Sequence, residues 1–298
     1  MNHFIISTDS CVDLFKSSLA ERNIYCIMLK RIVDGKETSE LYDSESEYDR
    51  FYEEIKKGKL PTTTQLNSFE LQEYFESILA KEPHGDIIHI PLSSGLSGTC
   101  DNAKATADTL NKTLNGRKIY VVDSLIATVG MAYLVERLIE LRDSETATTE
   151  AVRRIEETRD HLQGWVIAGN LFHLKRGGRI SGFKAAVGTL LNMKPIIILS
   201  KMGRLAVENT MKGNKKAIKY ILGNVEKMGV HAVPDFFKNP IYLARTSKNE
   251  LFDEMKRAFT EKYPQAVIKE YTVGPIIGTH LGDGCAIALF EGAPRLDI

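Results

Sequence analysis

One stretch of the chain reads Ser93-Ser94-Gly95-Leu96-Ser97-Gly98-Thr99. The residues before it, 87–92, form an apolar run with the length of a buried strand. After it, Ala103, Ala107, Leu110 and Leu114 recur at the spacing of one helix face. The stretch therefore predicts a turn at which a strand passes into a helix.

Two interpretations of this turn are open. Glycines allow a ligand to approach the backbone closely, and hydroxyls with free N–H groups at a helix start favour an anion. Alternatively, the serines and the threonine only cap the helix and hydrogen-bond locally.

Strands and helices alternate along the first half of the chain. Expected strands cover residues 4–7, 25–33, 87–92 and 119–122, and expected helices cover residues 12–22, 44–57, 68–79, 101–114, 127–141 and 146–159. This alternation predicts an α/β domain with a parallel sheet and helices on both of its faces.

Acid and hydroxyl residues follow three of these strands, at Asp9-Ser10, Ser93-Ser94 and Asp123-Ser124. Ligands of parallel sheets lie beyond the carboxyl ends of the strands, so we expect these residues at one edge of the sheet. The two aspartates either belong to a site there or only cap helices and brace loops. A loop rich in hydroxyls, Pro61 to Gln65, precedes the helix expected at 68–79.

The second half predicts another α/β domain, with two layers. Strands are expected at residues 164–169, 195–199, 205–207, 241–244 and 267–271, with a helix at 249–262. A turn at Met202-Gly203 joins two of these strands as a hairpin. An apolar stripe at Phe183, Val187, Leu190 and Leu191 predicts a short helix. We expect the two domains at residues 1–163 and 164–298.

Two further stretches combine glycines with basic residues. The first, residues 171–179, carries Lys175, Arg176 and Arg179 around a glycine pair that marks a helix end or a tight turn. In the second, residues 273–282, glycines on both sides of His280 would expose its ring to a cleft or bend the backbone tightly.

Composition argues against several classes of protein. Lys plus Arg total 39, as do Asp plus Glu, so the chain lacks the positive field of a general nucleic-acid binder. The four cysteines have no metal-ligand spacing and suit a reducing compartment. No apolar run reaches the length of about 18 residues that a membrane span needs, and polar residues come too early for a signal peptide. We therefore expect a cytoplasmic protein.

Five motifs occur in order across nearly the whole chain. They are Thr8-Asp9-Ser10, the stretch Ser93 to Thr99, Leu174-Lys175-Arg176-Gly177-Gly178-Arg179-Ile180-Ser181, Leu190-Leu191-Asn192-Met193-Lys194-Pro195 and Gly274-Pro275-Ile276-Ile277-Gly278-Thr279-His280. In this combination the chain resembles the DegV family of bacterial fatty-acid-binding proteins. The resemblance implies two α/β domains with one fatty acid in an apolar tunnel between them. Some members are the acyl-carrier subunit of a fatty acid kinase, and a separate kinase protein phosphorylates the carboxylate with ATP.

The resemblance also assigns residues to the fatty acid. Thr63 and Ser94 would hydrogen-bond the carboxylate, with His280 in the same network. The whole expected fatty-acid-binding set is Thr63, Ser94, His280, Ser93, Thr64 and Gly95.

Other roles follow from the same resemblance. Arg179 and Lys212 would face the partner or the acyl phosphate. No catalytic residue, no metal and no cofactor are expected, the fatty acid being the only ligand. The expected partners are a long-chain fatty acid and the kinase protein, without nucleic acid or stable membrane insertion, and we expect a monomer.

The chain departs from the family pattern in four places. Thr63-Thr64-Gln65-Leu66 stands where a Thr-Ser-Gln-Pro loop is usual, so the loop loses the stiffness of the proline. Lys212 replaces an arginine and keeps the charge without the bidentate fork. Leu281 is unusual at its position, and Asp283 stands where proline is common. These departures bear on partner docking more than on lipid binding.

Two other functions are compatible with the residue types. Ser94 or Ser97 with His280 and an aspartate (Asp9 or Asp123) could serve a serine hydrolase or esterase acting on lipid esters, but the Gly-x-Ser-x-Gly elbow lacks its final glycine. The basic residues of 175–179 and 212–219 suit a nucleic-acid-binding module or a docking patch for an anionic partner.

Overall fold

A computed structural model describes residues 4–39, 41–169, 171–180 and 192–295. The chain folds as two compact units. The first unit comprises Met1–Asp43 and Thr63–Arg159, and the second comprises Ser44–Thr62 and Asp160–Ile298. This division differs from the expected domains at residues 1–163 and 164–298, because one segment of the amino-terminal half belongs to the second unit.

The first unit is built on a four-stranded sheet whose neighbouring strands run parallel. The order is β2-β1-β6-β7. The strands are β1 (Phe4–Asp9), β2 (Ile24–Ile27), β6 (Asp86–Ile90) and β7 (Ile119–Val121). They are rich in β-branched residues, which suits strands buried on both faces. The predicted parallel sheet is confirmed.

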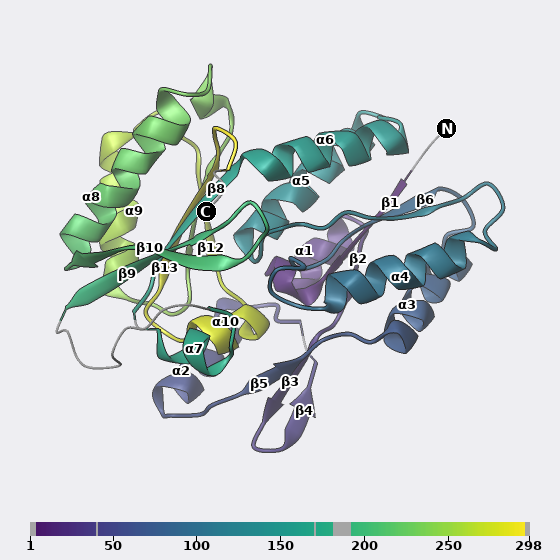
Figure 1. The fold of residues 1–298 in the computed structure, drawn as a ribbon, viewed down its shortest axis with the longest axis horizontal. Coiled ribbons are helices and arrows are strands. Elements are labelled where there is room, and N and C mark those ends of the chain that lie inside the picture. Colours follow the sequence, from purple (N-terminus) through teal and green to yellow (C-terminus); the bar gives the residue numbers. More distant parts are fainter. Residues whose placement is uncertain (1–3, 40, 170, 181–191, 296–298) are drawn as a thin grey trace. The chain divides into compact units, whose positions relative to one another are not determined.

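Helices cover both faces of this sheet, as predicted (Figure 1). They are α1 (Lys16–Glu21), α3 (Ser68–Lys81), α4 (Thr99–Asn111), α5 (Val129–Asp143) and α6 (Thr148–His161). Helix α3 packs Tyr74 and Phe75 against the ring of His89. The Ser7 hydroxyl lies 2.8 Å from both Tyr74 Oη and His89 Nδ1, so it joins β1, β6 and α3 in the core.

Three expected elements near the start of the chain were wrong in detail. The helix expected at 12–22 begins only at Lys16, because Asp13 adopts a left-handed φ of 54° after a short 3-10 turn, η1 (Ser10–Val12). The strand expected at 25–33 is two strands, β2 and β3 (Lys30–Val33), which belong to different sheets. Strand β3 lies between β4 (Lys36–Thr38) and β5 (Thr62–Thr64). The threonines expected in a loop thus form a strand, which β-branched residues favour.

The second unit is built on a six-stranded mixed sheet of order β10-β9-β8-β13-β11-β12. The strands are β8 (Leu162–Ile167), β9 (Met193–Leu199), β10 (Leu205–Lys212), β11 (Ile241–Arg245), β12 (Ile268–Thr272) and β13 (Ala286–Glu291). Strands β11 and β12 pair in parallel, and the other neighbours pair antiparallel. The predicted hairpin is confirmed by the pairing of β9 with β10. The sequence analysis missed β13, because a central strand is apolar throughout and shows no alternation.

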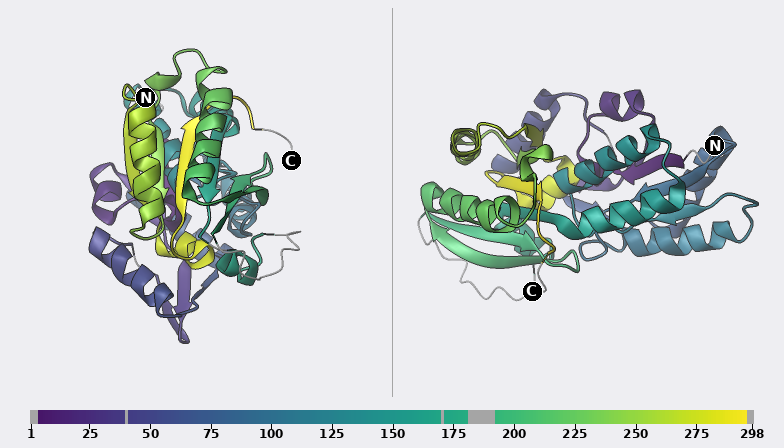
Figure 2. Two further views of the ribbon diagram at one scale, coloured as in Figure 1. Left: turned by 90° about the vertical axis from the view of Figure 1, so that its left-hand side faces the viewer. Right: turned by 90° about the horizontal axis from the view of Figure 1, so that it is seen from above.

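Two long helices, α8 (Asn214–Val225) and α9 (Glu250–Lys262), lie side by side over one face of this sheet (Figure 2). Ile221, Met255 and Phe259 on their inner faces are fully buried in the core that they share with the sheet. Two short turns, η2 (Glu226–Val230) and η3 (Phe236–Lys238), follow α8. The predicted two-layer α/β unit is confirmed.

Helix α2 (Glu45–Lys56) belongs to the second unit because it packs on α10 (Pro275–Leu281). The Tyr52 hydroxyl donates to the Val273 carbonyl at 2.7 Å. A Cβ atom at Gly278 would lie 2.5 Å from Tyr52 Oη, so the glycine allows this close approach. Contacts of this kind link distant parts of the chain, and no composition shift marks them.

The glycine-rich segment around His280 forms helix α10, so of the two alternatives the tight bend at His280 was wrong. Pro275 suits the first turn of a helix, where its missing N–H costs nothing. Gly282 ends the helix with a positive φ of 74°. The helix expected around Phe183 lies outside the described residues. No described helix combines the length and the apolar composition needed to cross a bilayer.

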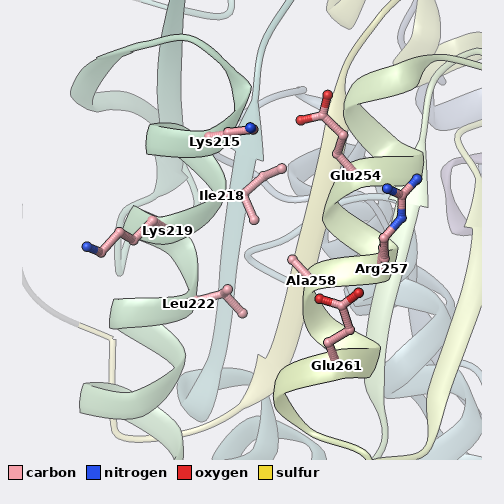
Figure 3. Close-up of a pocket in the computed structure, with 8 residues that line it drawn as sticks. All are labelled: Lys215, Ile218, Lys219, Leu222, Glu254, Arg257, Ala258 and Glu261. Atoms are coloured by element: carbon pink, nitrogen blue, oxygen red, sulfur yellow. The ribbon is translucent and has the colours of Figure 1, made fainter.

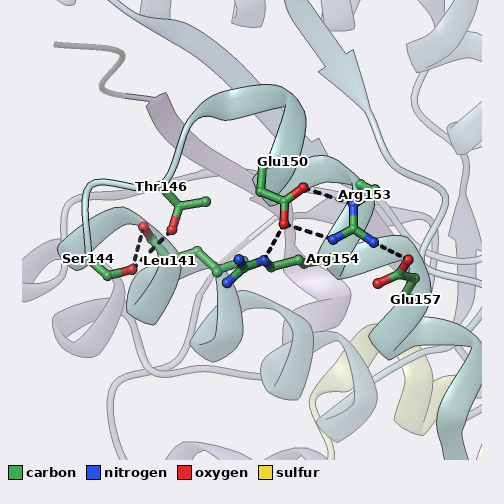
Figure 4. Close-up of polar contacts among 7 residues, drawn as sticks. All are labelled: Leu141, Ser144, Thr146, Glu150, Arg153, Arg154 and Glu157. Atoms are coloured by element: carbon green, nitrogen blue, oxygen red, sulfur yellow. Dashed lines mark hydrogen bonds and ion pairs between the residues drawn. The ribbon is translucent and has the colours of Figure 1, made fainter.

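Helix α6 carries a network of charges on its exposed side (Figure 4). Glu150 accepts hydrogen bonds from Arg153 and Arg154, at 2.8 and 2.6 Å, and Arg153 also contacts Glu157. These hydrogen bonds lower the pKa of Glu150 to about 2. The network is a solvated helix face whose pairs are one helical turn apart.

Candidate functional site

In the turn of residues 93–99 (the Ser/Gly turn), several backbone N–H groups donate hydrogen bonds within the turn. The Gly95 N–H donates to Ser93 Oγ at 3.1 Å. The N–H groups of Leu96 and Ser97 donate to the Ser93 carbonyl at 3.0 and 3.1 Å. These amides are occupied by local hydrogen bonds, as the second interpretation predicts, but helix α4 has Gly98 at its N-cap and no side-chain cap. An acid head group at this turn would therefore be held by hydroxyls rather than by these N–H groups.

Asp123 fixes the position of Ser94. Its Oδ1 atom accepts from the backbone N–H groups of Ser94 and Leu125, each at 3.1 Å, and its Oδ2 atom lies 3.6 Å from Nζ of Lys104. Burial opposes ionisation, but hydrogen bonds from the Ser94 side chain and from both amides outweigh it and lower the pKa of Asp123. The ionised carboxylate braces the turn and engages the Ser94 hydroxyl.

Asp9 braces the neighbouring strand ends in a similar way. Its side chain is fully buried, and its two oxygens accept from the N–H groups of Cys11 at 2.8 Å and Leu92 at 2.7 Å. Burial raises the pKa of Asp9 to about 6 against the lowering effect of these hydrogen bonds. The acid and hydroxyl pairs do meet at one edge of the sheet, as predicted, and both aspartates brace the backbone there.

The threonine strand β5 is tied to the Ser/Gly turn. The Leu66 N–H donates to Thr99 Oγ1 at 3.2 Å, and Asn102 Nδ2 donates to the Leu66 carbonyl at 2.7 Å. A Cβ atom at Gly98 would lie 2.5 Å from Gln65 Oε1, so this side chain packs directly on the glycine. Leu66 itself is buried.

These contacts narrow the set of hydroxyls that can meet one ligand. Ser93 is fully buried and its Oγ atom accepts from Gly95, whereas Ser94 is partly exposed. Thr63 and Thr64 are both partly exposed, but successive strand residues point to opposite faces. Only one of the two threonine side chains can therefore point to the side of β5 on which a ligand of Ser94 would lie.

His280 and Arg179 belong to the second unit. His280 lies on α10 against Gly177, where a Cβ atom would be 2.3 Å from Nδ1. Gly177 follows helix α7 (Phe172–Arg176). Burial, and next the charges of Arg179 and Arg176, lower the pKa of His280 to about 4. The ring is neutral at neutral pH, so it can take part in hydrogen bonds but supplies no counter-charge.

His173 was not predicted, but it lies near His280 together with Arg176 and Arg179. Its side chain is buried, and its Nδ1 atom has no hydrogen-bond partner among the described residues. A Cβ atom at Gly282 would lie 2.4 Å from its ring. Burial and the charge of Arg176 lower the pKa of His173. A signal was present, since His173 and Arg176 are three residues apart and share one helix face.

Arg179 and Lys212 do not form one patch. Arg179 is exposed and donates to the Gly177 carbonyl. The next residue, Ile180, bridges to Leu205 at the start of β10, whereas Lys212 ends that strand. Seven residues of strand span roughly 23 Å. Arg179 is therefore next to the start of β10 in the chain, through the bridge of Ile180, whereas Lys212 stands at the other end of that strand.

Comparison with known proteins gives the family. The family model described as "Uncharacterised protein, DegV family" matches residues 3–292. The chain belongs to the DegV family. A DegV domain-containing protein of Clostridium perfringens is 32% identical to it over 292 residues, which cover 98% of each chain.

Solved structures of other DegV proteins share the fold. The structure of DegV, a fatty acid binding protein from Bacillus subtilis, has a TM-score of 0.80 and 27% identity, and the match covers 98% of this chain and 100% of that one. A fatty acid binding DegV family protein from Streptococcus agalactiae has a TM-score of 0.83 over 99% of this chain and 100% of that one. At 21% identity, this second match shows a shared fold.

Two further features of this DegV protein bear on ligands. The part of the chain that the structure describes contains no group of three or more His, Cys, Asp or Glu residues that could hold a metal ion. Its cysteines are free thiols, with Cys26 partly exposed and the other three buried.

Proposed function

We propose that this DegV protein binds one long-chain fatty acid and presents its carboxylate to a separate fatty acid kinase, which forms the acyl phosphate. The Ser94 and Thr63 hydroxyls hold the carboxylate. The observation that carries the proposal is the anchoring of the threonine strand to the Ser/Gly turn, through Leu66 and Thr99, in a chain that matches the family over residues 3–292. The Bacillus subtilis relative, described as a fatty acid binding protein, supports the ligand class.

The two parts of a fatty acid would make different contributions. Burial of one methylene contributes about 0.8 kcal/mol, so roughly fourteen methylenes contribute about 11 kcal/mol before the loss of chain freedom. Each hydrogen bond to a charged head group adds about 1.5–3 kcal/mol. The acyl chain thus sets the affinity and the hydroxyls set the orientation. An apolar tunnel between the two units stays a prediction, as do a monomeric state and a cytoplasmic location.

Arg179 and His280 are assigned to the transfer step. Arg179 supplies an exposed guanidinium, whose planar fork suits an acyl phosphate or an acidic partner. The neutral His280 ring can hydrogen-bond a carboxylate without fixing it in an ion pair that phosphorylation would have to break. This chain then needs no catalytic base, because the kinase supplies the chemistry.

Native mass spectrometry of the protein purified from cells tests the ligand. We expect a bound mass that matches a long-chain fatty acid, and uptake of added palmitate by protein stripped of lipid. Absence of a bound acid together with no uptake of palmitate would contradict the proposal.

Acyl phosphate formation with a purified fatty acid kinase and ATP tests the partner role. Arg179→Ala should retain palmitate and lower the rate of phosphorylation by about tenfold or more, because the fork to the phosphate is lost. Arg50→Ala removes an exposed arginine from α2 and should leave the rate unchanged. If Arg179→Ala instead empties the protein of palmitate, the assigned role is wrong.

The geometry of the described residues does not favour the alternative serine hydrolase. A hydrogen-bonded Ser–His pair exists at Ser7 and His89, but both residues are fully buried and out of reach of an ester. Ser97 Oγ lies 3.0 Å from Thr99 Oγ1 within the turn, and the Ser94 side chain is engaged by Asp123. Labelling of Ser94 by a fluorophosphonate probe is the result that would favour a hydrolase.

A further inference from the structure

Helices α8 and α9 of the second unit enclose a groove of about 360 Å³ (Figure 3). Its floor is apolar and consists of Ile218 and Leu222 from α8 and Ala258 from α9. Figure 3 shows all three side chains pointing into the space between the helices. None of the residues predicted to hold the fatty acid lines this groove, so it is separate from the site described above.

The two walls of the groove carry different charge. Lys215 and Lys219 line it from α8, and Glu254, Arg257 and Glu261 line it from α9. The α8 wall is therefore positive, and the α9 wall has one net negative charge. Figure 3 shows Lys215 directed across the groove toward α9.

The five charged side chains of the walls make no hydrogen bond or ion pair with any residue that the structure describes. Two other charged residues of α9 are paired. Lys256 lies 2.7 Å from Glu270, and Lys262 lies 3.0 Å from Glu226. Five unpaired charges thus border the apolar floor of the groove, which is typical of the rim of a binding surface.

We infer that this groove binds one amphipathic helix of a partner protein. Its lining residues extend over two turns of α8, or about 10 Å, which matches two turns of a bound helix. A helix satisfies its own backbone, whereas an extended peptide would need a sheet edge, and this groove lies between two helices. Charge complementarity specifies the partner helix. Its apolar residues, three or four apart, face the floor of the groove. Its acidic residues face the lysines of α8, and its basic residues face the glutamates of α9.

Synthetic peptides test this inference on the full chain. Three labelled helical peptides of about 18 residues share one leucine stripe with helical spacing. One has a glutamate flank and a lysine flank, one has two lysine flanks, and one has two glutamate flanks. In fluorescence anisotropy we expect the mixed peptide to bind at least about tenfold tighter than the other two, and this preference to weaken with added salt.

Charge reversal of one wall sharpens the test. The double variant Lys215→Glu/Lys219→Glu makes both walls negative, so the peptide with two lysine flanks should become the tightest ligand. Lys216→Glu, on the same helix but outside the lining, should keep the wild-type order. If the first variant fails to fold by circular dichroism, Glu254→Lys/Glu261→Lys reverses the other wall and should favour the peptide with two glutamate flanks.

Three results would overturn the inference. The peptides could bind equally, or not at all. The order could stay unchanged after charge reversal. Finally, the chain could dimerise in a concentration-dependent way that Lys215→Glu/Lys219→Glu abolishes, which would make a second copy the occupant of the groove.

Discussion

The Ser94 hydroxyl lies beside the Asp123 carboxylate. It has one proton to donate, and the ionised Asp123 carboxylate beside it accepts hydrogen bonds from this residue. A bound acid would compete with Asp123 for that proton, while Lys104 offsets part of the aspartate charge. Because the N–H groups of residues 94–97 are occupied, Ser94 and Thr63 together carry the recognition of the head group in our proposal.

Ser94→Ala and Thr63→Ala should each weaken palmitate binding by about 1.5–3 kcal/mol, or roughly 10- to 150-fold, since each removes one hydrogen bond to the charged head group. Displacement of a fluorescent fatty acid measures the change. Thr62→Ala is the matched control, because Thr62 is exposed and alternates with Thr63 along β5. Wild-type affinity in both site variants would rule out the proposed head-group contacts.

Asp9 gives a pH dependence of stability with a defined sign. Its pKa is raised from 3.8 to about 6, so the folded state binds the proton more tightly than the unfolded state. The stabilising contribution is complete below about pH 4 and is lost as the pH rises through about 6, on the order of 3 kcal/mol in all.

Urea unfolding between pH 4 and pH 7.5 measures this effect. The free energy of unfolding of the wild type, relative to Asp9→Asn, should fall across this range. Taking the difference cancels groups present in both proteins, such as His89, whose pKa burial lowers to about 3. Asp108→Asn, an exposed residue of α4, should show no such trend. A difference that does not vary with pH would contradict the assignment.

At the level of elements, glycines set how closely the helices of the second unit pack. Gly278 admits Tyr52 of α2, Gly177 admits the ring of His280, and Gly282 admits the ring of His173. In each case an added Cβ atom would lie within 2.5 Å of its neighbour. These glycines thus allow α2, α7 and α10 to pack closely.

Gly177→Ala should destabilise the protein by about 1–3 kcal/mol, because overpacking forces the His280 ring or the backbone to move. Gly223→Ala is the control. Gly223 lies on α8 with no atom near its Cβ position, so alanine there should stabilise by about 0.5–1 kcal/mol. Urea unfolding measures both changes. A Gly177→Ala protein as stable as the wild type would show that this close packing is not required.

At the scale of the whole molecule, each unit has its own sheet and its own helices. The chain passes twice from the first unit to the second, because α2 belongs to the second. A ligand that binds only the folded protein stabilises it by mass action.

Palmitate at about 100 times its dissociation constant should therefore raise the free energy of unfolding of lipid-free protein by about 2.7 kcal/mol. Urea unfolding with and without palmitate measures the shift. At the same palmitate concentration, Ser94→Ala should show a smaller shift, since its affinity is lower. No shift in the wild type would contradict binding to the folded state.

Local patterns of the sequence determined much of the fold. Helix α3 was predictable because Asn67 and Glu70 form a capping box before an apolar face, and the β9–β10 hairpin because two apolar strands flank a turn at Gly203. The Ser/Gly turn and the edge with Asp9 and Asp123 were predictable because parallel strands end on one side of their sheet.

Only the tertiary structure decided the remaining features. Helix α2 joins the second unit through Tyr52, which contacts a residue far away in the sequence. Strand β13 shows no alternating pattern, because it is buried on both faces and its buried residues are all apolar. Three other features depend on which side chains meet in space. They are the hydrogen bonding of the turn's amides, the place of His173 beside Arg176 and the unpaired charges around the α8–α9 groove. Spacing along a chain reports neighbours on one element, whereas these properties depend on packing between elements.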